Sequence, residues 1–262
     1  MNDFLNGEGD HLVRKELTDE QLLRYSRQIM LPNIDVAGQE KILNSSMLIV
    51  GLGGLGSPVA MYLASAGVGR LILVDHDEVE LSNLQRQIVH SIDTVGESKV
   101  KSAKARIAQL NPDCDVIIHK TKLTDDNVEL LVQEVDVVID CSDNFTSRFA
   151  LNRACVQCKV PLVSGAAIRM EGQLSVFDAR RGDSPCYRCL YDDSESEDLS
   201  CATNGVLAPV VGVVGSIQAL EALKLIAECG EPVVGKLMIF DMASMDWRTM
   251  KLKKDAACPV CG

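Results

Sequence analysis

The sequence predicts an α/β protein with a Rossmann-like, doubly wound and mostly parallel sheet and an antiparallel C-terminal half. Short apolar runs alternate with helical stretches through residues 18–160, which is typical of βαβ units. The composition is 47% hydrophobic but only 4% aromatic, which favours a buried parallel sheet of Val, Ile, Leu and Ala. Two adjacent strands and a hairpin in the second half indicate antiparallel pairing.

The N-terminal half of the predicted domain, residues 18–160, contains alternating strands and helices. Thr18 begins the first helix with Gln21 at its capping-box position, and Gly67 ends the helix before the second strand. The expected helices cover 18–29, 38–43, 57–66, 96–112, 124–133 and 144–159, and the expected strands cover 47–50, 71–74, 116–118 and 135–140. Residues 1–17 are polar and are expected to be flexible.

The C-terminal half, residues 161–262, follows a different pattern. The expected strands cover 161–168 and 172–177, a helix covers 210–227, and a hairpin covers 236–242 and 246–252. Residues 179–205 are polar and acidic and predict a crossover loop, because so long a stretch without regular structure is usually functional. Glu221 and Lys224 argue against the apolar helix as a membrane span. Residues 18–262 are therefore expected to form a single domain.

The charge and the cysteine content narrow the class of protein. The chain of 262 residues has 26 basic and 37 acidic residues and a net charge of −11, which argues against nucleic acid or an anionic membrane as the main partner. The N-terminus lacks the apolar core of a signal peptide, so a cytoplasmic location is expected. There the ten cysteines are expected to be free thiols or metal ligands rather than disulfides.

A glycine-rich turn follows the first strand and predicts a nucleotide site. Gly51, Gly53 and Gly56 have the spacing G-x-G-x-x-G, and Gly54 makes the turn unusually open. Glycines let the backbone approach a phosphate closely, and the helix behind them directs free N–H groups and its positive dipole end at the anion. Asp75 ends the second strand 19 positions after Gly56, where a carboxylate can hold ribose hydroxyls.

A polar segment follows Asp75 and offers candidate phosphate ligands. It contains Asn83, Gln85 and Arg86 and is too polar for a core element. Loops at the carboxyl ends of strands carry ligands in open α/β sheets. Lys99 lies in the first turn of the next helix, against the usual dipole preference, which indicates either an anion nearby or simple solvation.

Acidic residues follow the strand over 135–140. Asp140 and Asp143 lie where a Mg²⁺ or ribose ligand would sit, although Asp143 or Asn144 is equally suited to cap the next helix. Arg24 and Arg27 are three positions apart and are expected to share a helix face. That face is either a solvated basic surface or part of a site.

Three hypotheses fit the glycine turn. The first is an NAD-dependent dehydrogenase, and the second is a nucleotide-sensing binding module without chemistry. The third is an enzyme of a nucleoside triphosphate, because Arg86 and Lys99, with Arg27 as a further candidate, exceed what a dinucleotide pyrophosphate needs. Binding of NADH without any effect of ATP would favour the first hypothesis. Binding of ATP without pyrophosphate release would favour the second.

Two C-x-x-C pairs predict a four-thiolate zinc site. Cys186 and Cys189 form one pair, and Cys258 and Cys261 form the other, 69 positions further on. Each pair supplies two corners of the tetrahedron that zinc prefers. With all four positions taken by thiolate, the site is expected to be structural. A third pair, at 155–158, lies within an expected helix and is attributed to packing.

Beyond these local features, the chain resembles the ubiquitin-activating-like adenylyltransferases, the ThiF/MoeB/HesA family, from residue 17 to residue 262. The matching motifs are RYSRQI, GLGGLGSP, LSNLQRQ, DCSDN, CYRCL, APVVGVVGSIQALEALK and CPVCG. The segment VSGAAIRMEGQ at 163–173 is similar to the branch that serves molybdenum cofactor biosynthesis. The branch that serves the thiamine sulfur carrier is the near alternative.

The resemblance implies a homodimeric nucleotidyltransferase that uses ATP and Mg²⁺. Its partner would be a small ubiquitin-fold sulfur-carrier protein, the small subunit of molybdopterin synthase, whose C-terminal Gly-Gly carboxylate it would adenylate with release of pyrophosphate. The resemblance places the nucleotide against Gly51, Gly53, Gly54, Gly56, Asp75, Ser82, Asn83, Leu84, Gln85, Arg86, Lys99, Asp143 and Asn144.

Particular roles follow from the same resemblance. Asp75 would hold the ribose, Arg86 and Lys99 would address the phosphates with Asn83, and Asp143 would bind Mg²⁺. Arg27 would reach the triphosphate bound by the other subunit. Cys201 stands where related enzymes carry a thioester or persulfide cysteine, and an incidental free thiol is the alternative.

Overall fold

The computed structural model describes residues 14–192 and 204–262 and places eight strands in one sheet, in the order β3-β2-β1-β4-β5-β6-β7-β8. The strands are β1 Ser46–Val50, β2 Arg70–Val74, β3 Asp115–His119, β4 Val137–Asp140, β5 Leu162–Ile168, β6 Glu171–Phe177, β7 Lys236–Asp241 and β8 Asp246–Lys251. Neighbours from β3 to β5 are parallel, and those from β5 to β8 are antiparallel. The predicted mostly parallel sheet with an antiparallel C-terminal half is confirmed.

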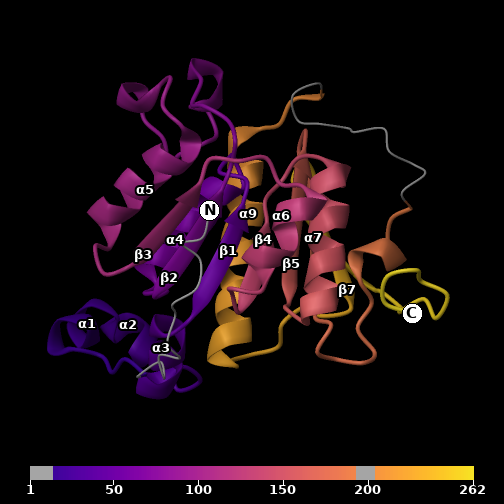
Figure 1. Cartoon of the computed structure of the whole chain (residues 1–262), viewed down its shortest axis with the longest axis horizontal. Coiled ribbons are helices and arrows are strands. Elements are labelled where there is room, and N and C mark those ends of the chain that lie inside the picture. The colour runs from indigo at the N-terminus through magenta and orange to yellow at the C-terminus, as the bar shows by residue number, and fades with distance from the viewer. Residues whose placement is uncertain (1–13, 193–203) are drawn as a thin grey trace, which may run out of the picture.

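Helices cover both faces of the sheet (Figure 1). They are α1 Asp19–Arg24, α2 Ser26–Ile29, α3 Asp35–Leu43, α4 Gly56–Ser65, α5 Lys99–Leu110, α6 Asp125–Val132, α7 Phe145–Cys158 and α9 Ala208–Ala227, with short 3-10 turns η1 Leu81–Asn83, η2 Ile92–Thr94 and η3 Tyr187–Cys189. Met47 and Ile49 of β1 pack with α4, α5 and α9. Leu48 and Val50 face the other way, towards α6 and α7.

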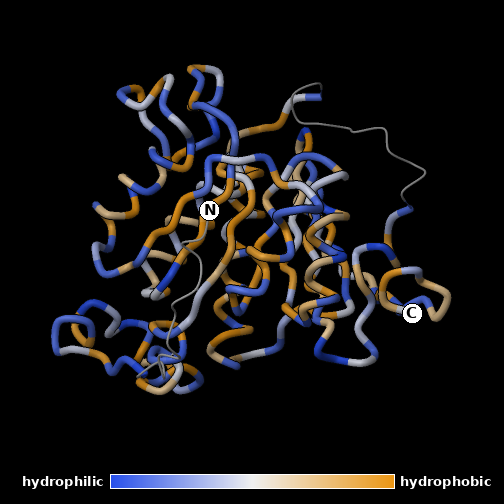
Figure 2. Tube along the Cα trace, in the orientation of Figure 1, coloured by the Kyte–Doolittle hydropathy of each residue, from blue (hydrophilic) through white to orange (hydrophobic). Residues whose placement is uncertain are grey.

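The alternation of β1 buries both faces of the strand, as expected for the centre of a parallel sheet. Figure 2 shows the resulting hydrophobic interior, with hydrophilic segments mainly at the periphery. The strand order changes direction between β1 and β4, and ligands of open α/β sheets bind at the carboxyl ends of the strands beside such a point. These ends point to the top of Figure 1, whereas α1, α2 and α3 lie at the opposite end.

The N-terminal helix is shorter than its sequence suggests. Thr18 and Gln21 form the predicted capping box, but the helix breaks at Tyr25, and α2 begins at Ser26. The Tyr25 ring is buried, and its hydroxyl accepts a hydrogen bond from Asn111 at 2.9 Å. Arg24 donates to the carbonyl of Leu110 at 3.1 Å. The expected shared helix face of Arg24 and Arg27 is therefore wrong, because the two lie on separate helices.

Helix α9 is the longest helix of the described residues and packs along α4 and β5. Within 14–192 and 204–262 it alone is long and apolar enough to cross a membrane by length and composition. Glu221 on this helix is buried and accepts hydrogen bonds from Lys224 at 2.6 Å and from the backbone N–H of Val233 at 2.8 Å. These paired charges and the packing on the sheet are those of a core helix.

The predicted crossover loop, 179–205, is described in part. Its first section contains η3, and its end is joined to the β5–β6 hairpin, where the N–H of Arg169 donates to the carbonyl of Gly205 at 2.8 Å. Cys201 lies outside the described residues. So do residues 1–13 of the segment that is predicted to be flexible.

Candidate nucleotide site and thiol cluster

A cavity of about 530 Å³ lies at the carboxyl ends of β1, β2 and β4. Eight of the residues predicted to bind the nucleotide line it, namely Gly51, Gly53, Gly54, Asp75, Arg86, Lys99, Asp143 and Asn144. The cavity continues along the β5–β6 hairpin, where Ala166, Ala167, Gly172 and Gln173 form its wall. One space therefore joins the glycine turn, the two predicted cations and an acidic loop.

The glycine turn is fixed by close backbone approaches. Gly51 has a φ of +92°, and a Cβ on it would lie 2.6 Å from the carbonyl oxygen of Cys141. A Cβ on Gly56 would lie 1.9 Å from the carbonyl oxygen of Gly51, so no side chain fits there. At Gly54 the obstacle is Val211 of α9, whose Cγ2 atom would be 2.8 Å away. Gly54 therefore lets α9 approach the turn, a reason that the sequence alone did not reveal.

Asp75 is buried at the end of β2 and stabilises the turn. One carboxylate oxygen accepts from the N–H of Leu52 at 2.7 Å, and the other accepts from the N–H of Asp77 at 2.8 Å. A carboxylate has about four acceptor positions, so two remain for ribose hydroxyls. The carbonyl of Leu52 accepts from Nε2 of His90 at 3.0 Å, so the two peptide groups on either side of the Leu52 Cα are both held.

The two cations that the sequence predicted for the cavity, Lys99 and Arg86, differ in their surroundings. Lys99 is buried at the start of α5, and its Nζ lies 2.8 Å from a carboxylate oxygen of Asp77. Burial alone would raise the pKa of Asp77, but the Lys99 ammonium outweighs it and lowers that pKa. Arg86 is half-buried and donates to the carbonyl of Ser82 at 3.3 Å. Asp77 pairs with Lys99. It was missed at the sequence level because the two residues are 22 positions apart.

Some predicted residues are not brought to the cavity. Ser82, Asn83, Leu84, Gln85 and Gly56 do not line it. The side chain of Asn83 is buried and accepts from the N–H of Glu80 at 3.3 Å, which supports the loop that carries Arg86. Arg27 lies on α2 at the other end of the sheet (Figure 1). Its predicted role in a second subunit stays a prediction.

The polar residues at the end of β4 and in the loop after it have different contacts. Asp140 is fully buried. Its Oδ1 accepts two hydrogen bonds from Ser142, one from the N–H at 3.0 Å and one from the hydroxyl at 2.6 Å. Asp140 therefore stabilises the fold rather than binding a ligand. Asn144 is the helix cap and accepts from the N–H of Ser147 at 2.9 Å. Asp143, between them, lines the cavity. Of the two alternatives for the cap, Asn144 is correct, and Asp143 is left available to a ligand.

Arg148 of α7 was missed at the sequence level. It is buried, lines the cavity, and donates to the carbonyl of Ser142 at 2.8 Å. Burial alone would lower its pKa, but the charge of Asp140 and the Tyr187 side chain outweigh burial and raise it. The available signal was Asp140 itself, since a carboxylate in a fully apolar strand requires a partner.

The four cysteines of the two knuckles lie together beside η3, and none of them lines the cavity. Their sulfurs are all within 4.8 Å of one another, with 3.7 Å between Cys186 and Cys258 and 3.5 Å between Cys189 and Cys261. Four sulfurs about 2.3 Å from one zinc ion would be about 3.8 Å apart in a tetrahedron. The cluster therefore fits zinc.

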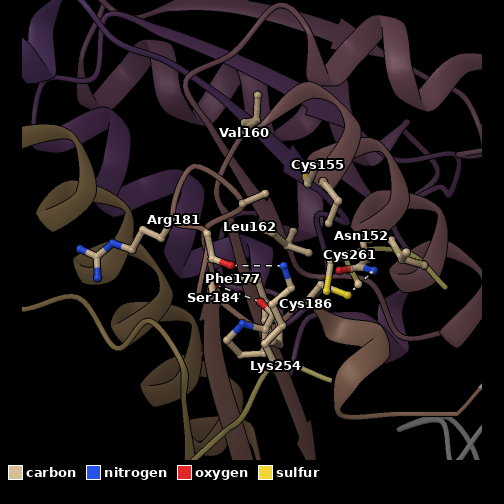
Figure 3. A pocket seen from close by; sticks show the side chains of 16 residues that line it. Asn152, Cys155, Val160, Leu162, Phe177, Arg181, Ser184, Cys186, Lys254 and Cys261 are labelled. Carbon is tan, nitrogen blue, oxygen red and sulfur yellow. Dashed lines mark hydrogen bonds between the residues drawn. The ribbon is translucent and has the colours of Figure 1, made fainter. Parts of the chain in front are cut away.

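Neighbouring groups support these sulfurs as ligands. Asn152 Nδ2 lies 3.5 Å from the sulfur of Cys186 (Figure 3). The N–H of Asp255 lies 3.5 Å from the sulfur of Cys189. At Cys258 backbone N–H groups of the knuckle outweigh burial and bring the pKa to about 7, whereas burial raises the pKa of Cys186 and Cys261. Cys155 and Cys158 lie on consecutive turns of α7, outside the cluster, as predicted.

Fold and cavity together define a nucleotide-binding α/β protein with a separate four-cysteine cluster. The chain belongs to the ThiF family, whose model matches residues 25–260. This confirms the resemblance predicted from the motifs.

Relatives with known names agree with the family. The chain is 49% identical to molybdopterin-synthase adenylyltransferase of Escherichia coli (strain K12) over 247 residues, which cover 94% of this chain and 99% of the relative. It is 45% identical to the sulfur carrier protein ThiS adenylyltransferase of the same organism, with 94% and 97% covered. A crystal structure of E. coli MccB with ATP matches with a TM-score of 0.80 and 25% identity, covering 91% of this chain and 74% of that one.

Proposed function

We propose that this chain is the adenylyltransferase of molybdopterin synthase, an enzyme of molybdenum cofactor biosynthesis. It transfers AMP from ATP to the C-terminal glycine carboxylate of a ubiquitin-fold sulfur-carrier protein and releases pyrophosphate. Membership of the ThiF family and 49% identity over nearly the whole of a molybdopterin-synthase adenylyltransferase support this function.

The observation that carries the proposal is the continuation of the cavity along the β5–β6 hairpin. Ala166, Ala167 and Gly172 line the same space as the glycine turn and Arg86. Small side chains leave room for the extended backbone of a Gly-Gly tail. Because the second half of a dinucleotide would also need space beyond the glycine turn, it is membership of the ThiF family that argues against the dehydrogenase.

The residues of the cavity suit this reaction. An oxygen of the tail carboxylate forms a bond to the α-phosphorus, and the bond from that phosphorus to the bridging oxygen breaks, with its electron pair leaving on pyrophosphate. Two anions must approach each other, so fixed positive charge lowers the barrier. Arg86 and Lys99 line the cavity and would supply this charge. Mg²⁺ held at Asp143 would supply further positive charge when bound.

Three finer assignments belong to the same proposal. Zinc occupies the four-cysteine cluster and has a structural role, since all four positions are thiols. The protein acts as a cytoplasmic homodimer, in which Arg27 serves the partner's site. Exposed apolar side chains near Arg27 support an interface there, because Leu23, Met30 and Leu31 are 77%, 70% and 52% exposed.

The thiamine sulfur carrier is the alternative substrate, because the relative that acts on ThiS is nearly as similar, at 45% identity. The segment VSGAAIRMEGQ at 163–173 favours the molybdopterin carrier. Its last residues, from 166 to 168 and from 171 to 173, line the branch of the cavity assigned to the tail. Carrier choice is therefore expected to reside in this hairpin.

Carrier-dependent ATP–pyrophosphate exchange tests the proposal. Exchange is expected with the small subunit of molybdopterin synthase and is expected to be much weaker with the thiamine carrier. Arg86→Ala is expected to abolish exchange without loss of fold. Arg106→Ala is the matched control, because Arg106 is an exposed arginine of α5 that donates to Gln109. The assignment would be overturned if neither carrier supported exchange, or if Arg86→Ala showed normal exchange.

A further inference from the structure

The buried face of α7 connects the two sites. Arg148 and Asn152 are one turn apart and therefore lie on the same side of the helix. Both side chains are buried. Arg148 contacts the loop that carries Asp143, and Asn152 contacts the first cysteine knuckle. One rigid helix thus contacts both the nucleotide cavity and the thiol cluster.

At the cavity, Ser142 is held at every polar group. Its N–H and hydroxyl donate to Asp140, and its carbonyl accepts from Arg148. The next residue is Asp143, whose side chain faces the cavity, and Asn144 then caps α7. The position of Asp143 is therefore fixed from both sides, and one of the fixing groups is the guanidinium of Arg148.

At the cluster, the same guanidinium reaches Tyr187. Nη1 of Arg148 lies 3.5 Å from the Tyr187 hydroxyl. The N–H of Tyr187 donates to Asn152 at 2.8 Å, and the other end of the Asn152 amide lies 3.5 Å from the sulfur of Cys186. Tyr187 is only 2% exposed and packs against Tyr191 with ring centroids 4.8 Å apart. A shift of the knuckle must therefore move the Tyr187 ring.

The Arg148 side chain has few other partners. Its Nε atom is buried and has no hydrogen-bond partner among the described residues. Its Nη2 also lies 3.4 Å from the carbonyl of Gly165, and the Asp140 carboxylate attracts the guanidinium. The contact with the Ser142 carbonyl is the shortest of these, and the contact with Tyr187 is the one that reaches the knuckle. The guanidinium therefore contacts both sites at once.

We propose that Arg148 is a positioning residue that couples the thiol cluster to the nucleotide cavity, so that zinc and Mg·ATP each strengthen the binding of the other. The inference rests on the proposed function in taking Mg·ATP as the ligand of the cavity. Without metal, four thiols at these distances separate, Tyr187 moves, and Arg148 releases the Ser142 carbonyl beside Asp143. Coupling between two sites is reciprocal, so either ligand can report on the other.

The test measures zinc affinity of the full-length protein by competition with a colorimetric zinc chelator, with and without saturating Mg·ATP. Mg·ATP is expected to tighten zinc binding by about fivefold or more in the wild type. Arg148→Met and Arg148→Lys are expected to abolish this effect, because neither side chain can span Ser142 and Tyr187. Arg153→Met is the control, since Arg153 lies on α7 but is exposed and pairs with Asp125. The weak zinc binding of ATP itself is the same for all variants.

Each result decides the inference. Coupling in the wild type and in Arg153→Met, but in neither Arg148 variant, supports it. Equal coupling in the Arg148 variants overturns it. If the wild type binds Mg·ATP by calorimetry but its zinc affinity is unchanged, the inference fails while the proposed function stands. If the wild type does not bind Mg·ATP, the proposed function and the inference fall together. Where an Arg148 variant does not fold, an unchanged zinc affinity in the wild type still overturns the inference.

Discussion

The contact between Gly54 and α9 gives a prediction whose size follows from the structure. A Cβ at Gly54 would lie 2.8, 3.1 and 3.2 Å from Cγ2, Cβ and Cγ1 of Val211. All three distances are shorter than ordinary van der Waals contact, and Val211 is buried. Gly54 does not have a positive φ, so the backbone tolerates alanine. Gly54→Ala is therefore a purely steric change that we expect to cost about 1–3 kcal/mol of unfolding free energy.

The same contact predicts a rescue. Val211→Ala alone removes two methyl groups and is expected to cost about 1.6 kcal/mol or more. It also removes two of the three atoms that clash with the methyl group introduced by Gly54→Ala, namely Cγ1 and Cγ2, so the double variant is expected to be about 1–2 kcal/mol more stable than the sum of the single effects. Gly54→Ala is further expected to weaken ATP binding about tenfold, a loss of about 1.4 kcal/mol, because the turn moves into the cavity.

Urea unfolding followed by circular dichroism measures the stabilities, and calorimetry with Mg·ATP measures the affinities. Gly212→Ala is the control, because it adds a Cβ to α9 that would have no atom within 4 Å outside its own helix. It is expected to be neutral or stabilising by up to about 1 kcal/mol. Strict additivity of Gly54→Ala and Val211→Ala would refute the steric explanation. Unchanged ATP affinity in Gly54→Ala would refute the place of the turn in the site.

Two further predictions concern charges around the cavity. Burial lowers the pKa of His90 below its usual 6.5, even though the Leu52 carbonyl and Asp75 act in the opposite direction, while Lys99 adds to the lowering. The native state then binds fewer protons than the unfolded state as the pH falls through 6.5, so stability decreases in that direction. His90→Gln should flatten this dependence in urea midpoints between pH 8 and 5, and an unchanged slope would contradict it. Asp77→Asn removes a negative charge 2.8 Å from Lys99 and should tighten ATP binding by up to about fivefold. Calorimetry measures this affinity. Weaker binding in the variant would show that Asp77 itself assists the ligand.

Sequence reasoning located the elements because their signals are local. The strand at 46–50 is a short apolar run, Gly51 to Gly56 mark the turn, and each knuckle has its two cysteines three positions apart. Such patterns reflect the periodicity and backbone limits of a few neighbouring residues. They predicted the sheet, the glycine turn and the four-cysteine cluster.

The contacts that organise the site are not local, and this is why they were missed. Lys99 pairs with Asp77, 22 positions earlier, and Val211 meets Gly54, 157 positions earlier. The break at Tyr25 carries no glycine or proline signal, because it comes from burial of the ring and the bond from Asn111. Arg27 does not line the cavity of its own chain, so the role proposed for it requires the second subunit of the proposed homodimer.

The balance of charge around the cavity affects the form in which the nucleotide binds. Within the described residues its lining carries four cations, Arg86, Lys99, Lys122 and Arg148, and five carboxylates, Asp75, Asp77, Asp143, Glu171 and Asp192. The whole chain, with these residues included, has a net charge of −11. A free tetra-anionic nucleotide therefore meets little net attraction, despite the arginines and lysines that line the site. We expect the protein to select the magnesium complex, which carries its own countercharge, and to discriminate against the uncomplexed nucleotide at the moment of encounter.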